Sequence, residues 1–553
     1  MRLSRFLITA SLIGVSAVIA EARDNRAWVP DMGDGTYINP VINADYSDPD
    51  VVAVGDDFYM TASSFGCAPG LPILHSRDLV NWDIVNYALK EVPPTDFYSS
   101  APRHGKGVWA PSIRFHDGEY YIYWGDPDFG IFMVKTADPL GEWSEPVLVK
   151  AGKGMIDPTP LWDDDGRVYL VHAWAASRSR FNSIVTICEL NSDGTKVISQ
   201  PVLVFDGNDG VNHTIEGPKL YKRNGWYYIF APAGGVVDGW QIVLRSRSIY
   251  GPYESRIVMA QGDTPVNGPH QGAWVDNAAG ESWFLHFQDR GPYGRVIHLN
   301  PMAWDEDWPV IGEDSDGDGC GQPVMRHKKP AVSSKVAVTV PPTSDDFNSR
   351  ALGRQWQWHA NYNDTYGFTS DMGFMRLYGH ILTPDAPNFW EVPNLLLQKF
   401  PAEEFTATAK VKISAKASSE GVMSGLIVMG WDYGALGVEK TGDNFTLKLV
   451  TCHDAEQGNR QEAETIATIK PSRVYEAGLY PNLECDLYLR VKVGKGAVCK
   501  FSYSLDGKKF ISAGQPFQAR AGKWIGAKTG LFSVTPDGND RGWIDIDNFI
   551  VTK

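Results

Sequence analysis

The most regular feature of this sequence is a short polar turn followed by a strand-like alternation of apolar and polar residues. Five copies of this pattern lie between residues 54 and 288, and each contains a glycine at its turn. The copies are VGDDFYMTAS (54–63), HDGEYYIYWG (116–125), DDGRVYLVHAW (164–174), RNGWYYIFAPA (223–233) and AAGESWFLHFQ (278–288). A period of two predicts half-buried β-strands that follow hairpin turns.

These copies predict a repeat architecture, because the turn glycines stand 48 to 63 residues apart. Each interval has room for a few antiparallel strands, which is the content of one propeller blade. A barrel of alternating strands and helices would need helical periodicity between the strands, and the intervals show none. We therefore predict an all-β chain in which residues 31–330 form a five-bladed β-propeller.

The strand that precedes each turn begins at a position that is polar in four of the five copies. The five positions are Asp48, Ala110, Asp157, Glu216 and His270, and they stand 7 to 10 residues before the glycine. The first strand of every propeller blade lines the central axis, so equivalent positions converge there. We expect the three acids and the histidine to share one pocket.

Three carboxyl groups in one pocket suit acid–base chemistry. Crowding and burial raise the pKa of a carboxyl group, so one acid can keep its proton while another is ionised. A protonated acid that faces an ionised base is the arrangement of glycoside hydrolysis. The alternative is that each side chain only caps a strand end, but four such groups around one axis favour catalysis. Asp45 is a second candidate base, although it lies outside the repeat register and is typical of a loop carboxylate.

Five motifs carry a resemblance to a known family. They are NADYSDPD, VWAPSI, MIDPTPLWDDDGRVYL, TIEGPKLYKRNGWYYIF and NGPHQG, and the likeness covers roughly residues 35 to 330. Their order and spacing are similar to those of glycoside hydrolase family 43, inverting glycosidases that act on arabinose- and xylose-containing glycans. The resemblance implies Asp48 as general base, Glu216 as general acid, and Asp157 as the residue that modulates the pKa of the acid and orients it.

The same resemblance implies which residues bind the sugar. Phe65, Trp109 and Trp174 match pocket aromatics, and Arg295 matches an arginine that contacts substrate hydroxyl groups. His270 matches an axial histidine that often lies near a water-coordinated calcium ion. No cofactor is expected to be required, and a structural Ca²⁺ near His270 is the one metal that the resemblance suggests.

Two acidic features stand outside this scheme. Asp50 departs from the family pattern, which usually has a small residue such as Ser there, and could raise the pKa of the base or bind a cation. The string DSDGDG at 314–319 resembles the start of a calcium loop. Its twelfth position is Met325 instead of Glu, so we expect a turn or solvated loop.

A second domain follows the propeller. Residues 331–343 are rich in Pro, Ser and Val and predict a linker. Residues 344–553 contain at least seven alternating strands without the blade pattern, which predict a β-sandwich. The family resemblance implies a concanavalin-like jelly-roll that places a loop beside the propeller pocket. A separate carbohydrate-binding module is the alternative.

The N-terminus has the pattern of an export signal. Arg2 and Arg5 precede a short apolar run, which ends in an Ala-Glu-Ala site at 20–22. We expect residues 1–22 to be a cleaved signal peptide, and the mature protein to be periplasmic or secreted and free of the membrane. The alternative is a membrane anchor, for which the apolar run is short.

Composition limits the classes of binding partner that we expect. The chain has a net charge of −15 and no long basic run, so nucleic acid is not an expected partner. Its 19 tryptophans suit a surface that stacks on sugar rings. The six cysteines show no metal-binding spacing, although Cys485 and Cys499 could pair across strands.

The sequence therefore predicts an exo-acting, inverting glycoside hydrolase of oligosaccharides or polysaccharides. A lid from the second domain would close one end of the pocket and favour removal of terminal sugars. The segment 44–82 resembles a subgroup in which α-L-arabinofuranosidase activity is common, so terminal arabinofuranosyl residues of plant hemicellulose are the first expected substrate. β-D-Xylosidase or bifunctional activity is the alternative. Endo-arabinanase and a non-catalytic sugar-binding propeller are further alternatives.

Overall fold

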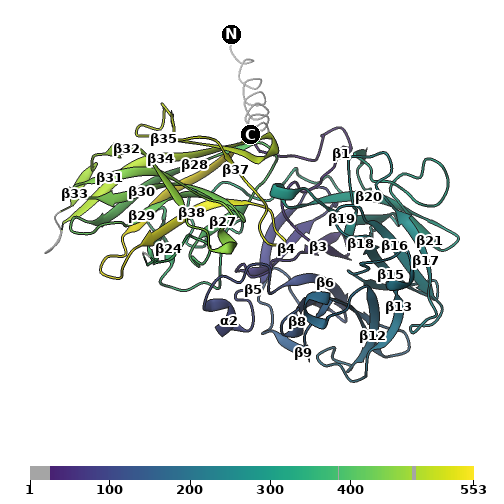
Figure 1. Cartoon of the computed structure of the whole chain (residues 1–553). Helices are drawn as coiled ribbons and strands as arrows, with labels where there is room; N and C mark the ends of the chain where they lie inside the picture. The colour runs from purple at the N-terminus through teal and green to yellow at the C-terminus, as the bar shows by residue number, and fades with distance from the viewer. Residues whose placement is uncertain (1–24, 384, 476–480) are drawn as a thin grey trace, which may run out of the picture.

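The computed structural model describes residues 25–383, 385–475 and 481–553, and the expected signal peptide lies outside these ranges. Strands dominate the described chain, which forms a ring of five small sheets beside two large sheets packed face to face (Figure 1). The five-bladed propeller and the C-terminal β-sandwich predicted from the sequence are both confirmed.

Each blade is an antiparallel sheet of four strands that follow one another in the chain. The first two blades contain β2 (Asp50–Val54), β3 (Asp57–Thr61), β4 (Gly70–Ser76), β5 (Asp83–Leu89), β6 (Trp109–His116), β7 (Glu119–Asp126), β8 (Gly130–Thr136) and β9 (Val147–Ala151). The third contains β10 (Met155–Trp162), β11 (Val168–Trp174), β12 (Ile184–Leu190) and β13 (Val202–Asp206). The last two contain β14 (Lys219–Arg223), β15 (Trp226–Ala233), β16 (Trp240–Ser246), β17 (Glu254–Met259), β18 (His270–Asp276), β19 (Ser282–Asp289), β20 (Arg295–Asp305) and β21 (Trp308–Ile311).

Glycine recurs in the first turn of every blade because the backbone there has positive φ. The five turn glycines have φ values between +63° and +82°: Gly55, Gly118, Gly166, Gly225 and Gly280. In the second and fourth blades the residue before the glycine, Asp117 or Asn224, also has positive φ, as a two-residue type I′ turn requires. Residues with a Cβ atom adopt this backbone only with strain. The repeated glycine therefore marks the hairpin between the first two strands of each blade.

The N-terminal segment helps to close the ring. β1 (Thr36–Ile38) pairs with β22 (Arg326–Lys328), which follows the fifth blade. The Asn39 side-chain amide donates to the carbonyl oxygens of Leu299 and Val324, both at 2.7 Å. β18 of the fifth blade lies beside β2 of the first. The five first strands consequently surround one axis.

Two sheets form the sandwich. One has the order β23 (Gln357–Trp358), β27 (Leu396–Lys399), β38 (Lys528–Thr535), β29 (Met423–Met429), β30 (Tyr433–Thr441), β31 (Asn444–Cys452) and β32 (Glu462–Ile469). The other has the order β24 (Gly367–Ser370), β25 (Phe374–Tyr378), β39 (Trp543–Thr552), β28 (Phe405–Lys416), β34 (Asn482–Gly494), β35 (Val498–Ser504) and β36 (Ile511–Ser512). The short strands β26 (His380–Ile381), β33 (Arg473–Tyr475) and β37 (Phe517–Gln518) pair with β38, β34 and β35.

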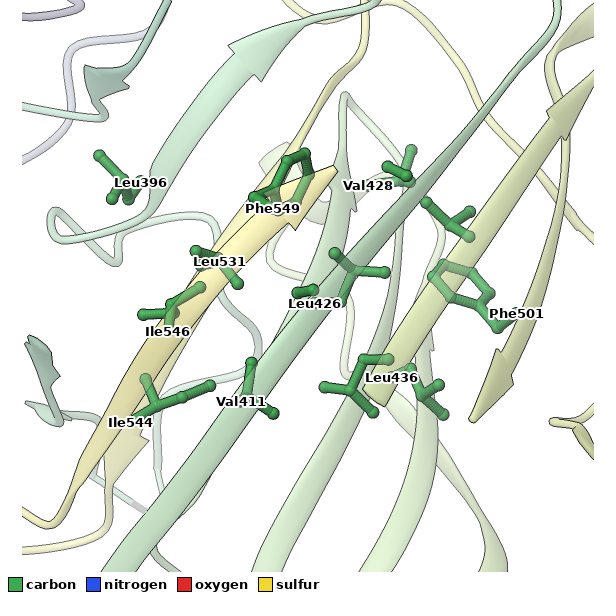
Figure 2. Packing of buried hydrophobic residues seen from close by; sticks show 14 of the residues in the cluster. Leu396, Val411, Leu426, Val428, Leu436, Phe501, Leu531, Ile544, Ile546 and Phe549 are labelled. Carbon is green, nitrogen blue, oxygen red and sulfur yellow. The ribbon is translucent and has the colours of Figure 1, made fainter. Parts of the chain in front are cut away.

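The core of the sandwich lies between these sheets. Over most of β28, alternate residues are buried, as expected for a strand that packs on one face. Figure 2 shows side chains from both sheets in one cluster, with Val411, Ile544 and Ile546 from one sheet and Leu426 and Leu436 from the other. This core is separate from the clusters that lie within and between the blades.

A loop of the sandwich, residues 520–527, reaches the propeller just before β38. The Gly526 N–H donates to Asp45 Oδ2 at 2.9 Å, and the Ala527 N–H donates to the Pro292 carbonyl oxygen at 2.8 Å. At a second contact, the Val92 N–H donates to Asn361 Oδ1 at 2.7 Å, and Asn361 Nδ2 donates back to the Val92 carbonyl at 3.0 Å. These buried contacts favour a sandwich docked on the propeller over a separately tethered module.

The described helices are short. They are α2 (Thr95–Ser99), α3 (Ala176–Ser179), η1 (Gly207–Asp209), η2 (Gly291–Tyr293), η3 (Ala455–Gln457) and η4 (Lys495–Ala497). Within the described ranges, no helix has the length and apolar character needed to cross a membrane. All six cysteines are free thiols, so the pairing of Cys485 with Cys499 considered from the sequence is not formed.

Candidate active site

The segment that leads into the first strand of each blade has the same backbone shape. One residue in each segment has a positive φ between +32° and +59°: Asp48, Ala110, Asp157, Gly217 and Gln271. Pro follows this residue in four blades and Gly in the fifth. These five residues are therefore the equivalent positions at the axis.

The register expected from the sequence was wrong by one residue in the last two blades. Glu216 and His270 immediately precede the positive-φ positions instead of occupying them. Counting back from the turn glycine could not fix this, because strand lengths differ and bulges interrupt the pairing near Trp109, Ile156 and His270. The error does not separate the side chains, since both registers lead to the same end of the axis.

A pocket lies where the five segments meet. The structure brings together in its lining the three predicted acids and four of the predicted sugar-binding residues. They are Asp48, Asp157, Glu216, Phe65, Trp109, His270 and Arg295. The other lining residues are Ala110, Ile156, Val236, Gln271 and Trp524.

Asp48 is held by two hydroxyl groups and one guanidinium. Its Oδ2 accepts hydrogen bonds from Ser47 Oγ at 2.8 Å and Ser63 Oγ at 2.5 Å, and Arg295 Nη1 lies 3.5 Å from Oδ1. Ser63 Oγ also accepts from the Ala110 N–H at 2.7 Å, so its own proton is directed at Asp48. Because every partner is a donor, the contacts suit the carboxylate form that a general base needs.

The surroundings of Asp157 favour its protonated form. It is 2% exposed, and this burial raises its pKa to about 8, with the negative charges of Glu216 and Asp48 acting in the same direction. The Gly217 N–H donates to Asp157 Oδ2 at 2.7 Å and partly opposes the rise. Gln271 Nε2 also contacts this oxygen, at 3.3 Å. The proton on Asp157 removes one negative charge from a crowded site.

Glu216 faces the pocket opening with His270 behind it. Its Oε1 lies 2.9 Å from His270 Nε2, and the Glu216 side chain is 35% exposed whereas that of His270 is 1% exposed. His270 Nδ1 has no hydrogen-bond partner among the described residues. A carboxyl group with one side open to solvent and the other anchored can meet an entering glycosidic oxygen.

Three aromatic side chains form the apolar wall. Phe65 and Trp109 meet edge to face with ring centroids 6.5 Å apart, and Trp109 and Trp524 do so at 6.1 Å. Trp524 comes from the sandwich loop and is 44% exposed. A sandwich loop was expected beside the pocket from the family resemblance, but Trp524 was not identified in it; a tryptophan between two strand-like segments, in AGKWIG, was the available signal.

Trp174 lies outside the pocket in which it was expected, whereas Asp45 is a loop carboxylate, as its position outside the repeat register indicated. Trp174 is not among the residues that line the pocket; its indole donates to Thr186 Oγ1 at 3.1 Å, and its ring packs on Phe181. Asp45 accepts from the Arg295 N–H through one oxygen and from the Gly526 N–H through the other, each at 2.9 Å. It therefore ties the fifth blade to the sandwich loop, and we assign it no role as a base.

The acidic loop at 314–319 lies outside the pocket lining. Asp314, Asp316 and Asp318 bring possible ligand atoms within 4.8 Å of one another, with two of the three residues exposed. Asp314 accepts hydrogen bonds from the Gly317 and Gly319 N–H groups. The sequence-based expectation of a turn or solvated loop accounts for this geometry.

A carboxylate held by donors, a buried protonated acid and an accessible glutamate around one propeller axis define the class as a glycoside hydrolase. Two family models match the chain. Residues 37–309 match glycosyl hydrolases family 43, and residues 344–552 match the β-xylosidase C-terminal concanavalin A-like domain. The chain belongs to glycosyl hydrolase family 43.

Similar proteins span nearly the whole chain. A Xylanibacter ruminicola protein with a provisional β-xylosidase name is 36% identical over 532 residues, covering 95% of this chain and 92% of its own. A β-xylosidase of Formosa agariphila is 33% identical, covering 97% and 93%. A non-reducing end α-L-arabinofuranosidase of Bacteroides ovatus is 31% identical, covering 76% and 79%. The solved structure of the family 43 protein BlXynB from Bacillus licheniformis has a TM-score of 0.76 at 25% identity, covering 94% and 99%.

Proposed function

We propose that this protein is an exo-acting, inverting β-D-xylosidase that removes terminal xylosyl residues from xylan-derived oligosaccharides. The observation that carries the proposal is the pocket in which Asp48, Asp157 and Glu216 lie together beside an aromatic wall. The choice of xylose is supported by the β-xylosidase names of relatives that align over almost the full chain and by the match of the second domain.

In the proposed reaction Glu216 donates its proton to the departing glycosidic oxygen. Asp48 removes a proton from a water molecule, whose oxygen attacks the anomeric carbon from the opposite face. Asp157 is buried and protonated, so it adds no negative charge beside Asp48 and Glu216. It also accepts a hydrogen bond from the Gly217 N–H and thereby holds the backbone next to Glu216. Carboxyl groups and water supply the whole chemistry, so no cofactor is required.

The pocket walls support removal of terminal sugars. Trp524 and the rest of the 520–527 loop stand beside the pocket, and Asp45 anchors this loop to the propeller. A pocket bounded on that side holds the end of a chain better than its middle. Arg295 lies next to the base and can donate to hydroxyl groups of the sugar.

α-L-Arabinofuranosidase activity is the second candidate. The likeness of the segment 44–82 to an arabinofuranosidase subgroup favoured it, and the Bacteroides ovatus relative carries that name. That relative is less similar and aligns over less of the chain than the two relatives with β-xylosidase names. We therefore rank xylose first and arabinose second, reversing the order that the sequence suggested.

A paired rate assay tests this proposal. Purified protein is incubated with 4-nitrophenyl β-D-xylopyranoside and 4-nitrophenyl α-L-arabinofuranoside, with Asp48→Asn as the inactive control. We expect kcat/KM to be higher on the xyloside and turnover to vanish in the variant. A higher kcat/KM on the arabinofuranoside would reverse the ranking. Binding of either sugar without turnover would indicate a propeller that only binds sugar.

We also propose that the mature protein is exported to the periplasm or secreted, on the strength of the N-terminal sequence pattern alone. N-terminal sequencing of protein from the host's soluble extracellular or periplasmic fraction tests this. A mature chain that starts after residue 22 is expected, and an uncleaved chain in the membrane fraction would contradict it.

A further inference from the structure

One level below the catalytic carboxyl groups, a second set of side chains fills the propeller axis. Its members stand two residues after the positive-φ position of each blade: Asp50, Ser112, Thr159, Lys219 and Ala273. All five are 0% exposed. Two of them carry opposite charges, which is costly in a buried layer unless both are compensated.

The neutral members of this layer link neighbouring blades. Ser112 Oγ donates to the Pro158 carbonyl oxygen of the next blade at 2.7 Å, and Thr159 Oγ1 donates to the Pro218 carbonyl oxygen at 2.9 Å. Both bonds close the gap between adjacent first strands. They give the layer a structural purpose that needs no charge.

Lys219 makes the same kind of bond across the axis. Its Nζ donates to the Pro111 carbonyl oxygen at 3.0 Å, from the fourth blade to the second. Because the third blade lies between these two, the side chain must run through the axial layer. Ser112 and Thr159 reach only the neighbouring blade, so Lys219 differs from them both in its reach across the axis and in carrying an ammonium group.

Asp50 carries the negative charge of this layer. Its Oδ2 accepts from Arg114 Nη1 at 2.6 Å and from the Ile113 N–H at 2.8 Å. The Arg114 guanidinium also packs over the Tyr221 ring, 4.9 Å from its centroid. Asp50 is thus paired with a guanidinium and does not stand free to bind a cation. Because the Asp50–Arg114 pair has no net charge, Lys219 supplies the net charge of the layer when it is protonated.

The charged groups that face Lys219 come from three other blades. Asp50 and Asp48 belong to the first blade, Arg114 to the second and Asp157 to the third; the fifth contributes uncharged Ala273 at this level. Burial lowers the pKa of Lys219, whereas the three acids favour its charged form. In return, the charge of Lys219 acts to lower the pKa of Asp157, against the effects of burial and of Glu216.

We propose that Lys219 is a positioning residue whose positive charge, set in balance with the Asp50–Arg114 pair, holds the general base ionised over the working pH range. Its charge lies one level below Asp48 and Asp157, and a positive charge near a carboxyl group favours the ionised form of that group. The inference rests on the proposed function only for its kinetic readout.

Opposite charge changes in this layer have opposite effects on the pH–rate profile. Lys219→Met removes a positive charge with little change in length, so protonation of the base becomes easier and the acidic limb of kcat/KM moves to higher pH. Asp50→Asn leaves Arg114 uncompensated, so the acidic limb moves to lower pH. We expect shifts of about 0.5–1 pH unit in each direction, and near cancellation in the double variant.

Ser112→Ala is the matched control. It removes a hydrogen bond of the same kind from the same layer but changes no charge. We expect it to lower the melting temperature without moving the acidic limb. A purely structural role of Lys219 predicts that Lys219→Met behaves in the same way, with a loss of stability and an unchanged profile.

The experiment measures kcat/KM of the full-length protein on 4-nitrophenyl β-D-xylopyranoside across pH 4–9, together with the melting temperature at each pH. Opposite shifts for the two charge variants support the proposal; shifts in one common direction, or none, overturn it. If Lys219→Met fails to fold, the test is made with Asp50→Asn alone. A shift of its acidic limb to lower pH then supports the proposal, and a shift to higher pH or no shift overturns it. If the wild type hydrolyses no glycoside, the proposed function fails, and the pH dependence of the melting temperatures still tests the inference, because it follows the same protonation.

Discussion

Replacing Asp157 by Asn should stabilise the protein in mildly alkaline solution. The folded-state pKa of Asp157 is about 8, against 3.8 for an exposed aspartate, so the folded protein binds more protons than the unfolded chain between these values. Stability therefore falls as the pH rises through this window. At about 1.4 kcal/mol per pKa unit the full shift corresponds to ~6 kcal/mol. This is an upper limit, because Glu216 and Asp48 share the titration.

The amide preserves the local contacts while it removes this pH dependence. Asn Oδ1 can accept from the Gly217 N–H as Asp157 Oδ2 does, and the amide takes the place of the protonated oxygen. We expect wild type and variant to be similar near pH 4, and the variant to be more stable at pH 8 by about 2–6 kcal/mol. For a domain of this size, that raises the melting temperature by roughly 4 °C or more.

Differential scanning calorimetry of both proteins from pH 4 to pH 8.5 measures the effect. The informative quantity is the difference between variant and wild-type melting temperatures at each pH, since other titrating groups cancel in it. A difference that grows with pH supports a protonated, buried Asp157. A difference that stays constant, or that favours the wild type at pH 8, would show that burial does not keep Asp157 protonated.

Three further substitutions test individual contacts. Glu216→Ala should lower kcat/KM by about 10²–10⁴-fold on xylosides with poor leaving groups and much less on dinitrophenyl xyloside, and an equal loss on both would argue against its role as the acid. Ser63→Ala removes the hydroxyl that donates to Asp48, so kcat should fall about 10–100-fold with little change in KM; an unchanged kcat would mean that this bond does not orient the base. Trp524→Ala should raise KM about tenfold and leave the melting temperature unchanged, because the side chain is 44% exposed. An unchanged KM in that variant would show that Trp524 of the sandwich loop does not contribute to substrate binding.

The architecture could be predicted from the sequence because it depends on local patterns that repeat. A glycine at positive φ in each first turn and the alternation after it are visible without coordinates. They locate all five blades and show that Asp48, Asp157 and Glu216 belong to one end of the axis. The sandwich was predictable for the same reason, from the period of its strands.

The predictions that were wrong or missing concern features that local sequence patterns do not determine. The one-residue register error at Glu216 and His270 arose because the number of residues between the turn glycine and the axial position differs among the blades, and no local pattern records this number. Trp174 matches a pocket aromatic of the family in sequence, but its ring packs on Phe181 instead. Trp524 belongs to the pocket only because the sandwich loop docks through Gly526 on Asp45, 481 residues earlier in the chain.

In the proposed mechanism, Asp48 and Glu216 act on opposite faces of the sugar. Proton NMR of the reaction with 4-nitrophenyl β-D-xylopyranoside measures it directly, through the anomeric signal of the xylose that appears before mutarotation. We expect α-xylose as the first product. If β-xylose appears first, the configuration is retained, and a base that activates water opposite the acid is contradicted.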